Sequence, residues 1–441
     1  MKRRTFLKTA AATALGVQII PRHVLGGDGH TPPSEKLNLA SIGVGGMGGS
    51  DIGSLAGGPI NMVAVCDVHE GNRNAAAGRF PAAKTFADWR ELLDQMDKQI
   101  DAVSVSTPDH MHAPISMSAI HRGKHVYCQK PLTHTIHEAR QIAAAARKAK
   151  VVTQMGIQIH STIEYRMATE LIQAGAIGKI KEVHSWSDRP SWPQGSPRPK
   201  GQNPVPKGLN WDLWLGVAPQ RPFIENAYAP FAWRGILDFG CGALGDMGCH
   251  IIDPPYTALK LTSPNVVWVE GPGCTDDMHP TWEILHYEFP GTEHTVGKTL
   301  NLTWYDGKHK PDESLVPLGK DQHLPSNGSI FIGEKGSILL PHIGGPQLLP
   351  REKFLDYKRP KLPGNNHYVQ WVNACLGKDK TSANFDFAGP LTETVLLGVL
   401  AARFPGKQLQ WDAANLKVTN LPEANQHVRL TYRKGWEVEG L

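Results

Sequence analysis

The chain has 441 residues, of which 40% are hydrophobic and 20% charged, and its formal net charge is +5. That length suggests two or three domains, and that composition excludes a disordered chain, because enough apolar side chains are present to build large cores. Apart from one N-terminal cluster the lysines and arginines are scattered, so no nucleic-acid partner is expected, and no run of 18 apolar residues predicts a membrane-spanning helix.

The N-terminus has the features of an export signal. It opens MKRRTFLK and continues with a short, weakly apolar stretch over 9–20 and small residues around Gly26. This pattern is typical of a secretory signal, and paired arginines followed by Phe-Leu-Lys resemble a twin-arginine (Tat) signal. We therefore expect a signal peptide over 1–27, a linker over 28–35, recognition by the Tat export machinery and a periplasmic or otherwise exported protein. The alternative is a helical N-terminus of a cytoplasmic protein.

Between residues 36 and 155, short apolar runs alternate with helical stretches. Strand character covers 37–42, 61–66, 102–106, 125–128 and 151–155, and helical character covers 87–96, 113–122 and 136–149. Short strands separated by helices predict a parallel, doubly wound α/β sheet. Cys66 and Cys128 end two of these runs, which favours buried free thiols, although disulfides among the six cysteines stay open.

Residues 156–441 have a different pattern. One helical stretch over 163–174 precedes longer alternating runs, which cover 183–186, 266–269, 282–289, 295–304, 329–331 and 337–340. These runs predict a second domain of α+β type with a large, open, mostly antiparallel sheet.

A glycine-rich turn follows the first strand. Gly43, Gly45 and Gly48 form G-x-G-x-x-G, and Asp67 ends the next strand 19 residues after Gly48. This is the pattern of a Rossmann dinucleotide site, in which the acidic residue binds the adenosine ribose. We expect cofactor contacts from Gly43, Gly45, Gly46, Met47, Gly48 and Asp67. A carboxylate there repels a 2′-phosphate, so NAD is favoured over NADP, although nearby Arg73 weakens this preference; the alternative is a glycine-rich turn with no nucleotide.

Two further motifs follow the next strands. Residues 106–112 read STPDHMH after the 102–106 run, and residues 127–132 read YCQKPL around the end of the 125–128 run. Ligands of open α/β sheets bind at the carboxyl ends of the strands. The residues there that we expect to contact the cofactor are Thr107, Pro108, His110, His112, Gln129, Lys130 and Gln158.

The fourth motif, over 239–253, holds Asp246 and His250. Residues four apart share one face of a helix, so Asp246 is expected to orient His250 as a general base. The alternatives are a helix cap for Asp246 and a core position for His250, and His160 is then the next candidate base. The sequence holds two groups of possible metal ligands: Cys241, Cys249 and His250, and Asp109, His110 and His112. Neither group has the spacing of a four-ligand zinc site, so no metal is expected.

Together these four motifs resemble the glucose–fructose oxidoreductase/inositol dehydrogenase (Gfo/Idh/MocA) family. The third motif reads Glu-Lys-Pro in that family, whereas Gln129 precedes Lys130 and Pro131 here. The resemblance implies that Lys130 contacts the nicotinamide side of the cofactor and the reacting hydroxyl, and that Asp246 and His250 form the family's Asp-x-x-x-His pair. It also implies a homodimer or homotetramer built on the second sheet. The segments 211–216 and 233–234 resemble the family's exported bacterial branch.

Residues 186–233 contain five of the 12 tryptophans and many prolines. Long loops in compact domains are usually functional. Two interpretations stay open: aromatic walls for a sugar ring with an arm over a neighbouring subunit, or aromatic packing of the loop onto its own domain.

We therefore expect a nicotinamide-dependent oxidoreductase with tightly bound cofactor. It would oxidise or reduce a hydroxyl or keto carbon of a sugar, polyol or glycoside, with Lys130, Asp246 and His250 as catalytic residues. One alternative is a redox-neutral glycosidase or lyase that works through a transient keto-sugar. The other is a non-catalytic sugar-binding protein that has kept its nucleotide, which the loss of the Glu beside Lys130 favours.

Overall fold

The computed structural model describes residues 32–441, so the signal peptide expected over 1–27 lies outside the described residues. The first sheet has six parallel strands in the order β3-β2-β1-β4-β5-β6. The strands are β1 (Leu37–Ile42), β2 (Ile60–Cys66), β3 (Lys84–Phe86), β4 (Ala102–Val105), β5 (His125–Gln129) and β6 (Thr153–Gly156). The connecting helices are α3 (Gly46–Leu55), α4 (Glu70–Arg79), α5 (Trp89–Met96), α6 (His112–His121) and α7 (Ile136–Ala149). This confirms the predicted parallel Rossmann sheet.

Local sequence explains where these elements begin. Thr135 and Glu138 form a reciprocal capping box at the start of α7, and Asp88 caps α5 by accepting a hydrogen bond from the backbone N–H of Arg90. All four residues of β4 are buried, as expected for a central strand with helices on both faces. β3 is an edge strand of three residues, too short for its alternation to be recognised in the sequence.

The second sheet has nine strands in the order β13-β12-β11-β7-β10-β9-β8-β14-β15. They are β7 (Ile180–Trp186), β8 (Val266–Glu270), β9 (Ile284–Pro290), β10 (Thr299–Tyr305), β11 (Gly328–Gly333), β12 (Ser337–Pro341), β13 (Gln347–Leu349), β14 (Leu409–Asp412) and β15 (Lys417–Val418). β7 and β10 pair in parallel and the other neighbours are antiparallel. The predicted mostly antiparallel sheet is confirmed.

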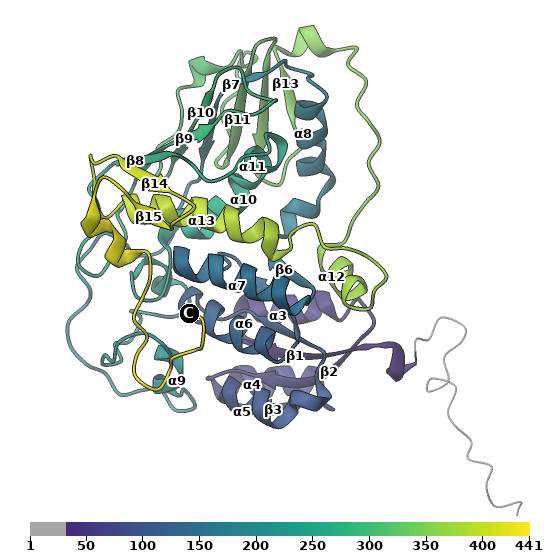
Figure 1. Cartoon of the computed structure of the whole chain (residues 1–441), viewed down its shortest axis with the longest axis vertical. Coiled ribbons are helices and arrows are strands. Elements are labelled where there is room, and N and C mark those ends of the chain that lie inside the picture. Colours follow the sequence, from purple (N-terminus) through teal and green to yellow (C-terminus); the bar gives the residue numbers. More distant parts are fainter. Residues whose placement is uncertain (1–31) are drawn as a thin grey trace, which may run out of the picture.

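Helices cover one face of this sheet and separate it from the first domain. They are α8 (Ile163–Gln173), α10 (Gly242–Ile251), α11 (Asp253–Ala258) and α13 (Phe385–Ala401); α9 (Trp211–Leu215) and α12 (His367–Cys375) lie beside the first domain. Figure 1 shows α13 running between the second sheet and α7. The sequence did not predict α12 or α13, because α13 is buried almost all round and therefore has no polar face.

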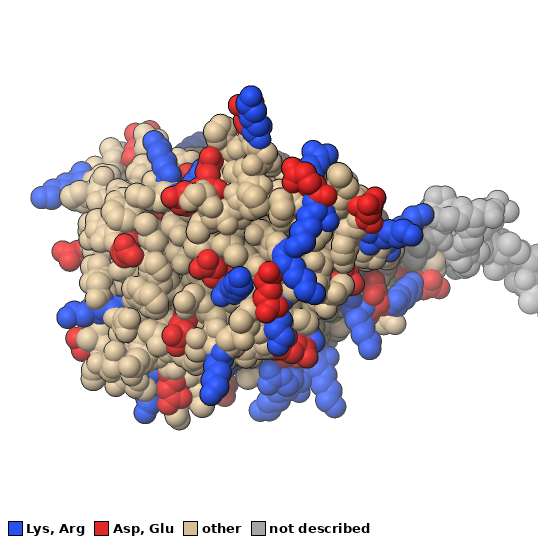
Figure 2. Space-filling model, turned by 90° about the horizontal axis from the view of Figure 1, so that it is seen from above, with Lys and Arg blue, Asp and Glu red and all other residues tan. Residues whose placement is uncertain are grey.

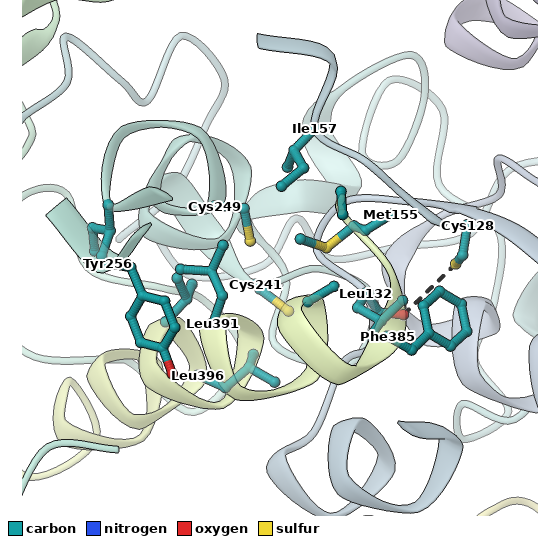
Figure 3. Packing of buried hydrophobic residues seen from close by; sticks show 14 of the residues in the cluster. Cys128, Leu132, Met155, Ile157, Cys241, Cys249, Tyr256, Phe385, Leu391 and Leu396 are labelled. Atoms are coloured by element: carbon teal, nitrogen blue, oxygen red, sulfur yellow. Dashed lines mark hydrogen bonds between the residues drawn. The ribbon is translucent and has the colours of Figure 1, made fainter. Parts of the chain in front are cut away.

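The two domains share one hydrophobic core. Cys128 of β5 and Met155 of β6 belong to the same buried cluster as Cys249 of α10 and Phe385 of α13. Figure 3 shows these side chains from close by, with the Cys128 thiol 3.7 Å from the carbonyl oxygen of Leu132. All six cysteines are free in the structure, and Cys66 and Cys128 are buried as expected.

The other face of the second sheet is only partly covered. The buried side chains Leu300, Leu302 and Trp304 of β10 all belong to the core on the helix side. The segment over 313–325 covers part of the opposite face, whereas β8 and β9 carry there Trp268 stacked on His286 at 4.8 Å. Over β8 and β9 that face is therefore aromatic and polar, whereas over β11 to β13 it is apolar and covered.

The C-terminal segment returns to the first domain, as the yellow chain in Figure 1 shows. Tyr432 donates a hydrogen bond to the Glu138 carboxylate, and Arg433 pairs with Asp212 at 2.5 Å. The guanidinium of Arg90 lies 4.0 Å over the ring of Trp436. These contacts hold the C-terminal segment against α7, α9 and α5.

On the face shown in Figure 2, acidic and basic side chains are interspersed, so this face has neither a large basic nor a large acidic patch. Within residues 32–441, no helix is long and apolar enough to cross a membrane.

Candidate active site

The glycine turn joins β1 to α3 and is hydrogen-bonded to the end of β2. Gly43 has φ +77° and donates its N–H to the carbonyl oxygen of Cys66. A Cβ at Gly48 would lie 1.9 Å from the Gly43 carbonyl oxygen, and a Cβ at Gly43 would lie 2.6 Å from that of Ser106. These positions therefore require glycine, and their spacing lets α3 begin directly at the turn.

The Asp67 carboxylate lies against this turn. It accepts hydrogen bonds from the backbone N–H groups of Val44 at 3.0 Å and Gly45 at 3.2 Å. Arg73 donates to the backbone carbonyl of Asp67 at 2.6 Å rather than to its carboxylate. The structure thus brings Asp67 and the glycine turn together.

Three observations fit a dinucleotide at this edge of the sheet. The N-cap residue of α3, Gly45, has no side chain to bond the first-turn N–H groups, which leaves them open to an anion. A Cβ at Gly46 would meet no atom within 4 Å, so the space over the turn is free. The hydroxyl of Thr107 is buried and has no hydrogen-bond partner among residues 32–441. Met47 lies at the same turn and is 47% exposed.

Lys130, at the carboxyl end of β5, reaches across to α10. Its Nζ donates to the Asp246 carboxylate at 2.6 Å and to the Asp246 carbonyl at 2.7 Å, and both side chains are about nine-tenths buried. Arg234 binds the same carboxylate at 3.1 Å. Burial alone would raise the pKa of Asp246, but the two cations hold it well below its usual range. Asp246 therefore stays ionised and fixes the Lys130 ammonium.

His250 lies one turn after Asp246 on α10. Its ring lies 5.7 Å from that of His342, and its Nδ1 is buried with no hydrogen-bond partner among the described residues. Burial, followed by the charge of Lys130, lowers the pKa of His250 well below its ordinary value. The expectation that Asp246 hydrogen-bonds and orients His250 is wrong, because the Asp246 carboxylate is bound by Lys130 and Arg234 instead. A helix-cap role for Asp246 is also excluded, since α10 begins four residues earlier, at Gly242.

A histidine oriented by a carboxylate is found nearby. His160, in the 3-10 turn Gln158–Ser161, has its Nδ1 2.9 and 3.0 Å from the two oxygens of Asp253, and Thr257 donates to the same carboxylate. Burial would lower the pKa of His160, but Asp253 raises it above the ordinary value. Both residues line a cavity of about 460 Å³ together with Tyr165, whose hydroxyl lies 2.8 Å from the His342 ring.

Comparison with known proteins assigns the chain to a family. The model described as "Oxidoreductase family, NAD-binding Rossmann fold" (GFO_IDH_MocA) matches residues 37–157, and the C-terminal alpha/beta domain model of the same family matches 180–299. Together they span more than half of the chain. The chain belongs to the Gfo/Idh/MocA oxidoreductase family. The description of this family is of oxidoreductases with an NAD-binding Rossmann fold.

Relatives within the family have sugar-related names. The chain is 28% identical over 198 residues to levoglucosan dehydrogenase of Pseudarthrobacter phenanthrenivorans, covering 44% of this chain and 41% of that protein. It is 28% identical over 205 residues to glycosyl hydrolase family 109 protein 1 of Shewanella sp. strain ANA-3, covering 40% and 44%. The chain thus spans less than half the length of these two curated relatives.

A solved structure shares the architecture over most of both chains. The WlbA dehydrogenase of Bordetella pertussis, in complex with NADH and UDP-GlcNAcA, superposes with a TM-score of 0.59 over 86% of this chain and 99% of that chain. The sequence identity is 16%, so the comparison shows a common fold.

Gln129 stands where the Gfo/Idh/MocA pattern has a glutamate, and the structure shows what holds it. Its amide Nε2 donates to both oxygens of Asp51 on α3, at 2.9 and 3.1 Å. Tyr368 of α12 donates to Asp51 at 2.8 Å and accepts from Gln158 at 2.9 Å. Sequence reasoning missed Asp51 and Tyr368; an acidic residue in an otherwise apolar helix directly after the glycine turn was the available signal.

His110 and His112 are both buried and lie close to backbone carbonyl oxygens. The His110 ring lies 3.2 Å from the Trp214 carbonyl oxygen and packs on Phe239, and burial lowers its pKa to about 3. Both ring nitrogens of His112 lie within 2.8 Å of backbone carbonyls, those of Pro131 and Thr107. These rings join loops of the chain at the carboxyl ends of β4 and β5, and cofactor contact by either residue stays a prediction. Pro108 accepts the Met111 N–H and starts this turn.

The tryptophan-rich loop packs on its own domain. Trp211 and Trp214 stack at 4.8 Å, and Tyr228 and Phe239 complete a buried aromatic cluster. Trp186 is fully buried within the second sheet. For these residues the packing interpretation is the one observed. Over residues 32–441, no group of three or more His, Cys, Asp or Glu is arranged to hold a metal ion.

Replacing Asp67 with alanine is expected to weaken NAD binding by about 1–3 kcal/mol, as for a lost hydrogen bond to a charged group. The variant should also lose part of its preference for NAD over NADP, because the carboxylate no longer repels a 2′-phosphate. Calorimetric titration with both nucleotides measures this, with Asp94→Ala as the control, since Asp94 pairs with Arg122 at an exposed site. Unchanged NAD affinity would place the ribose contact elsewhere.

Acid should destabilise the start of α10. His134 and His279 both lie within hydrogen-bond distance of the Gly240 carbonyl oxygen, and burial lowers their pKa values to about 4 and about 3. Because the unfolded histidines titrate near pH 6.5, their stabilising effect is full above that pH and is lost progressively as the pH falls toward 4.

The free energy of unfolding should fall between pH 7 and pH 4.5 in both proteins. We expect this fall to be about 1–3 kcal/mol smaller in the His279→Gln variant than in the wild type. Urea unfolding at the two pH values measures the difference. His323→Gln, at a side chain 79% exposed, is the control. Equal losses in His279→Gln and the wild type would contradict the assignment.

Proposed function

We propose that this oxidoreductase oxidises, or in reverse reduces, one carbinol carbon of a sugar, polyol or glycoside, using tightly bound NAD. The observation that carries the proposal is the cross-domain contact between Lys130 and Asp246. It fixes an ammonium at the carboxyl end of β5, beside a neutral buried imidazole. Bound at this edge of the sheet, NAD would supply the hydride acceptor for the carbinol carbon.

The chain's own groups handle the proton and the oxygen. The Lys130 ammonium hydrogen-bonds the substrate oxygen and stabilises the negative charge that develops on it. His250 accepts the hydroxyl proton, because its lowered pKa keeps it unprotonated at neutral pH, and the charge of Lys130 promotes loss of that proton. Asp246 and Arg234 set the position of Lys130.

A redox-neutral cleavage of a glycoside is the second candidate. It is supported by the likeness to the family 109 glycosyl hydrolase and by the His160–Asp253 pair, which offers a second proton-transfer group. Elimination next to a transient ketone needs such a group. A non-catalytic sugar-binding protein is the third candidate, and the Gln129 substitution alone supports it.

One experiment separates the three. Purified protein is denatured to release bound nucleotide, and native protein is incubated with a glycoside library and followed by mass spectrometry. A keto product supports net oxidation, release of the aglycone supports redox-neutral cleavage, and binding without either product supports a binding protein. Absence of bound nucleotide, together with no affinity for NAD or NADP, would refute the proposal altogether.

Export and assembly are parts of the same proposal. The MKRRTFLK start supports Tat export, which carries folded proteins and so permits cofactor loading before export. We expect a homodimer or homotetramer through the partly covered face of the second sheet, where Trp268 and His286 stack. Light scattering at micromolar concentration measures the mass, and a monomer would contradict this expectation.

A further inference from the structure

A fully buried carboxylate joins four elements around the cofactor edge of the first sheet. Asp51 on α3 is 0% exposed. It accepts hydrogen bonds from the Ser106 hydroxyl after β4 at 2.8 Å, the Gln129 amide at the end of β5 and the Tyr368 hydroxyl of α12 at 2.8 Å. Burial raises the pKa of Asp51, and the three donors act against that rise. An isolated buried carboxylate is costly, so this one is held by a built set of donors.

The Asp51 carboxylate determines the orientation of two side-chain amides, those of Gln129 and Gln158. Because Gln129 directs its NH₂ group at Asp51, its carbonyl oxygen must face the other way, where it lies 3.3 Å from the backbone N–H of Lys130. Because the Tyr368 hydroxyl donates its hydrogen bond to Asp51, its oxygen accepts a hydrogen bond from the NH₂ group of Gln158. Gln129 and Gln158 are two of the residues expected to contact the cofactor, and the orientations of both amides thus follow from Asp51.

The charges at positions 51 and 129 depend on each other. A glutamate at 129 would place a second carboxylate about 3 Å from Asp51 in a buried site, and two such groups cannot both ionise. One carboxylate and one amide therefore fit here.

We propose that Asp51 is the positioning residue for the nicotinamide end of the cofactor site: it fixes the Gln129 and Gln158 amides and holds the negative charge that favours NAD⁺ over NADH. This inference rests on the proposed use of NAD. A buried negative charge stabilises a cationic ring bound at the same sheet edge more than the neutral reduced ring. The bound cofactor is thereby biased toward its oxidised form.

The test exchanges the two groups. Asp51→Asn, Gln129→Glu and the double variant are compared with wild type by calorimetric titration of the full chain with NAD⁺ and NADH, alongside melting temperatures. Asp51→Asn removes the negative charge, so it should lower NAD⁺ affinity about tenfold more than NADH affinity. A tenfold difference corresponds to about 1.4 kcal/mol. Gln129→Glu should make NAD⁺ affinity pH-dependent between about pH 5 and 8, because two carboxylates then share a proton.

The double variant restores one amide and one carboxylate, and its ratio of NAD⁺ to NADH affinity should return to within threefold of wild type. Ser106→Ala removes a donor but no charge, so it should change the melting temperature and leave the ratio within twofold. If Asp51→Asn also changes only the melting temperature, Asp51 is structural and the proposal is overturned. If Asp51→Asn does not fold, the double variant decides: a wild-type ratio supports the proposal and an altered one overturns it. A wild-type protein that binds neither nucleotide refutes the proposed function instead.

Discussion

The His250→Ala variant is expected to turn over roughly 10²–10⁴-fold more slowly than wild type, the range for loss of a general base, with NAD affinity unchanged. The effect is expected on turnover because His250 lies on α10, in the second domain, whereas the glycine turn that we expect to bind the cofactor lies in the first. Stopped-flow measurement of NADH formation, with NAD binding measured separately, tests both halves. His323→Ala, at a histidine whose side chain is 79% exposed, is the matched control.

Lys130→Ala should also lower turnover, and it should weaken substrate binding as well. Because Lys130 and His250 act on the same hydroxyl, the double variant should lose less than the product of the two single losses. Fully multiplicative losses would mean that the two residues act independently. An active His250→Ala enzyme would transfer the role of base to His160, which the Asp253 carboxylate already orients; His160→Ala should then be the inactive variant.

The candidate site shows what local spacing can and cannot predict. The i, i+4 spacing places Asp246 and His250 on one face of α10, but it cannot show that Lys130, 116 residues away along the chain, reaches the same carboxylate. An ammonium 2.6 Å away is a far better partner for a buried carboxylate than a neutral imidazole, so the contact between domains decides the pairing. Partner choice of this kind depends on tertiary structure.

Asp51 illustrates the same limit. Its donors come from residues 106, 129 and 368, which no local pattern connects. By contrast, the glycine turn and Asp67 belong to two consecutive β-α units, so their spacing alone brings them together. The same reasoning explains the fold. The repeated short strands and helices of the first domain were predicted, whereas α13, which is buried almost all round and contains Pro390, has no periodic signal.

Among glycine-to-alanine substitutions in the nucleotide domain, Gly48→Ala should lower stability and NAD affinity the most. Gly48 lies in the first turn of α3 and is buried. The added Cβ would lie 1.9 Å from the Gly43 carbonyl oxygen and 3.1 Å from the Ser106 Cβ. The first of these is a backbone atom of the turn itself, so it cannot move aside as the end of a flexible side chain could. The turn must open, and α3 must shift away from β1.

We expect Gly48→Ala to destabilise the protein by about 1–3 kcal/mol, as overpacking of a well-packed site does, and to weaken NAD binding by more than tenfold. Gly78→Ala is the matched control: Gly78 lies in the last turn of α4, and a Cβ there would meet no atom within 4 Å. That variant should be as stable as wild type or slightly more so, since alanine favours a helix over glycine. Urea unfolding and NAD titration of both variants measure the difference. Normal NAD affinity in Gly48→Ala would show that the backbone of this turn does not hold the cofactor.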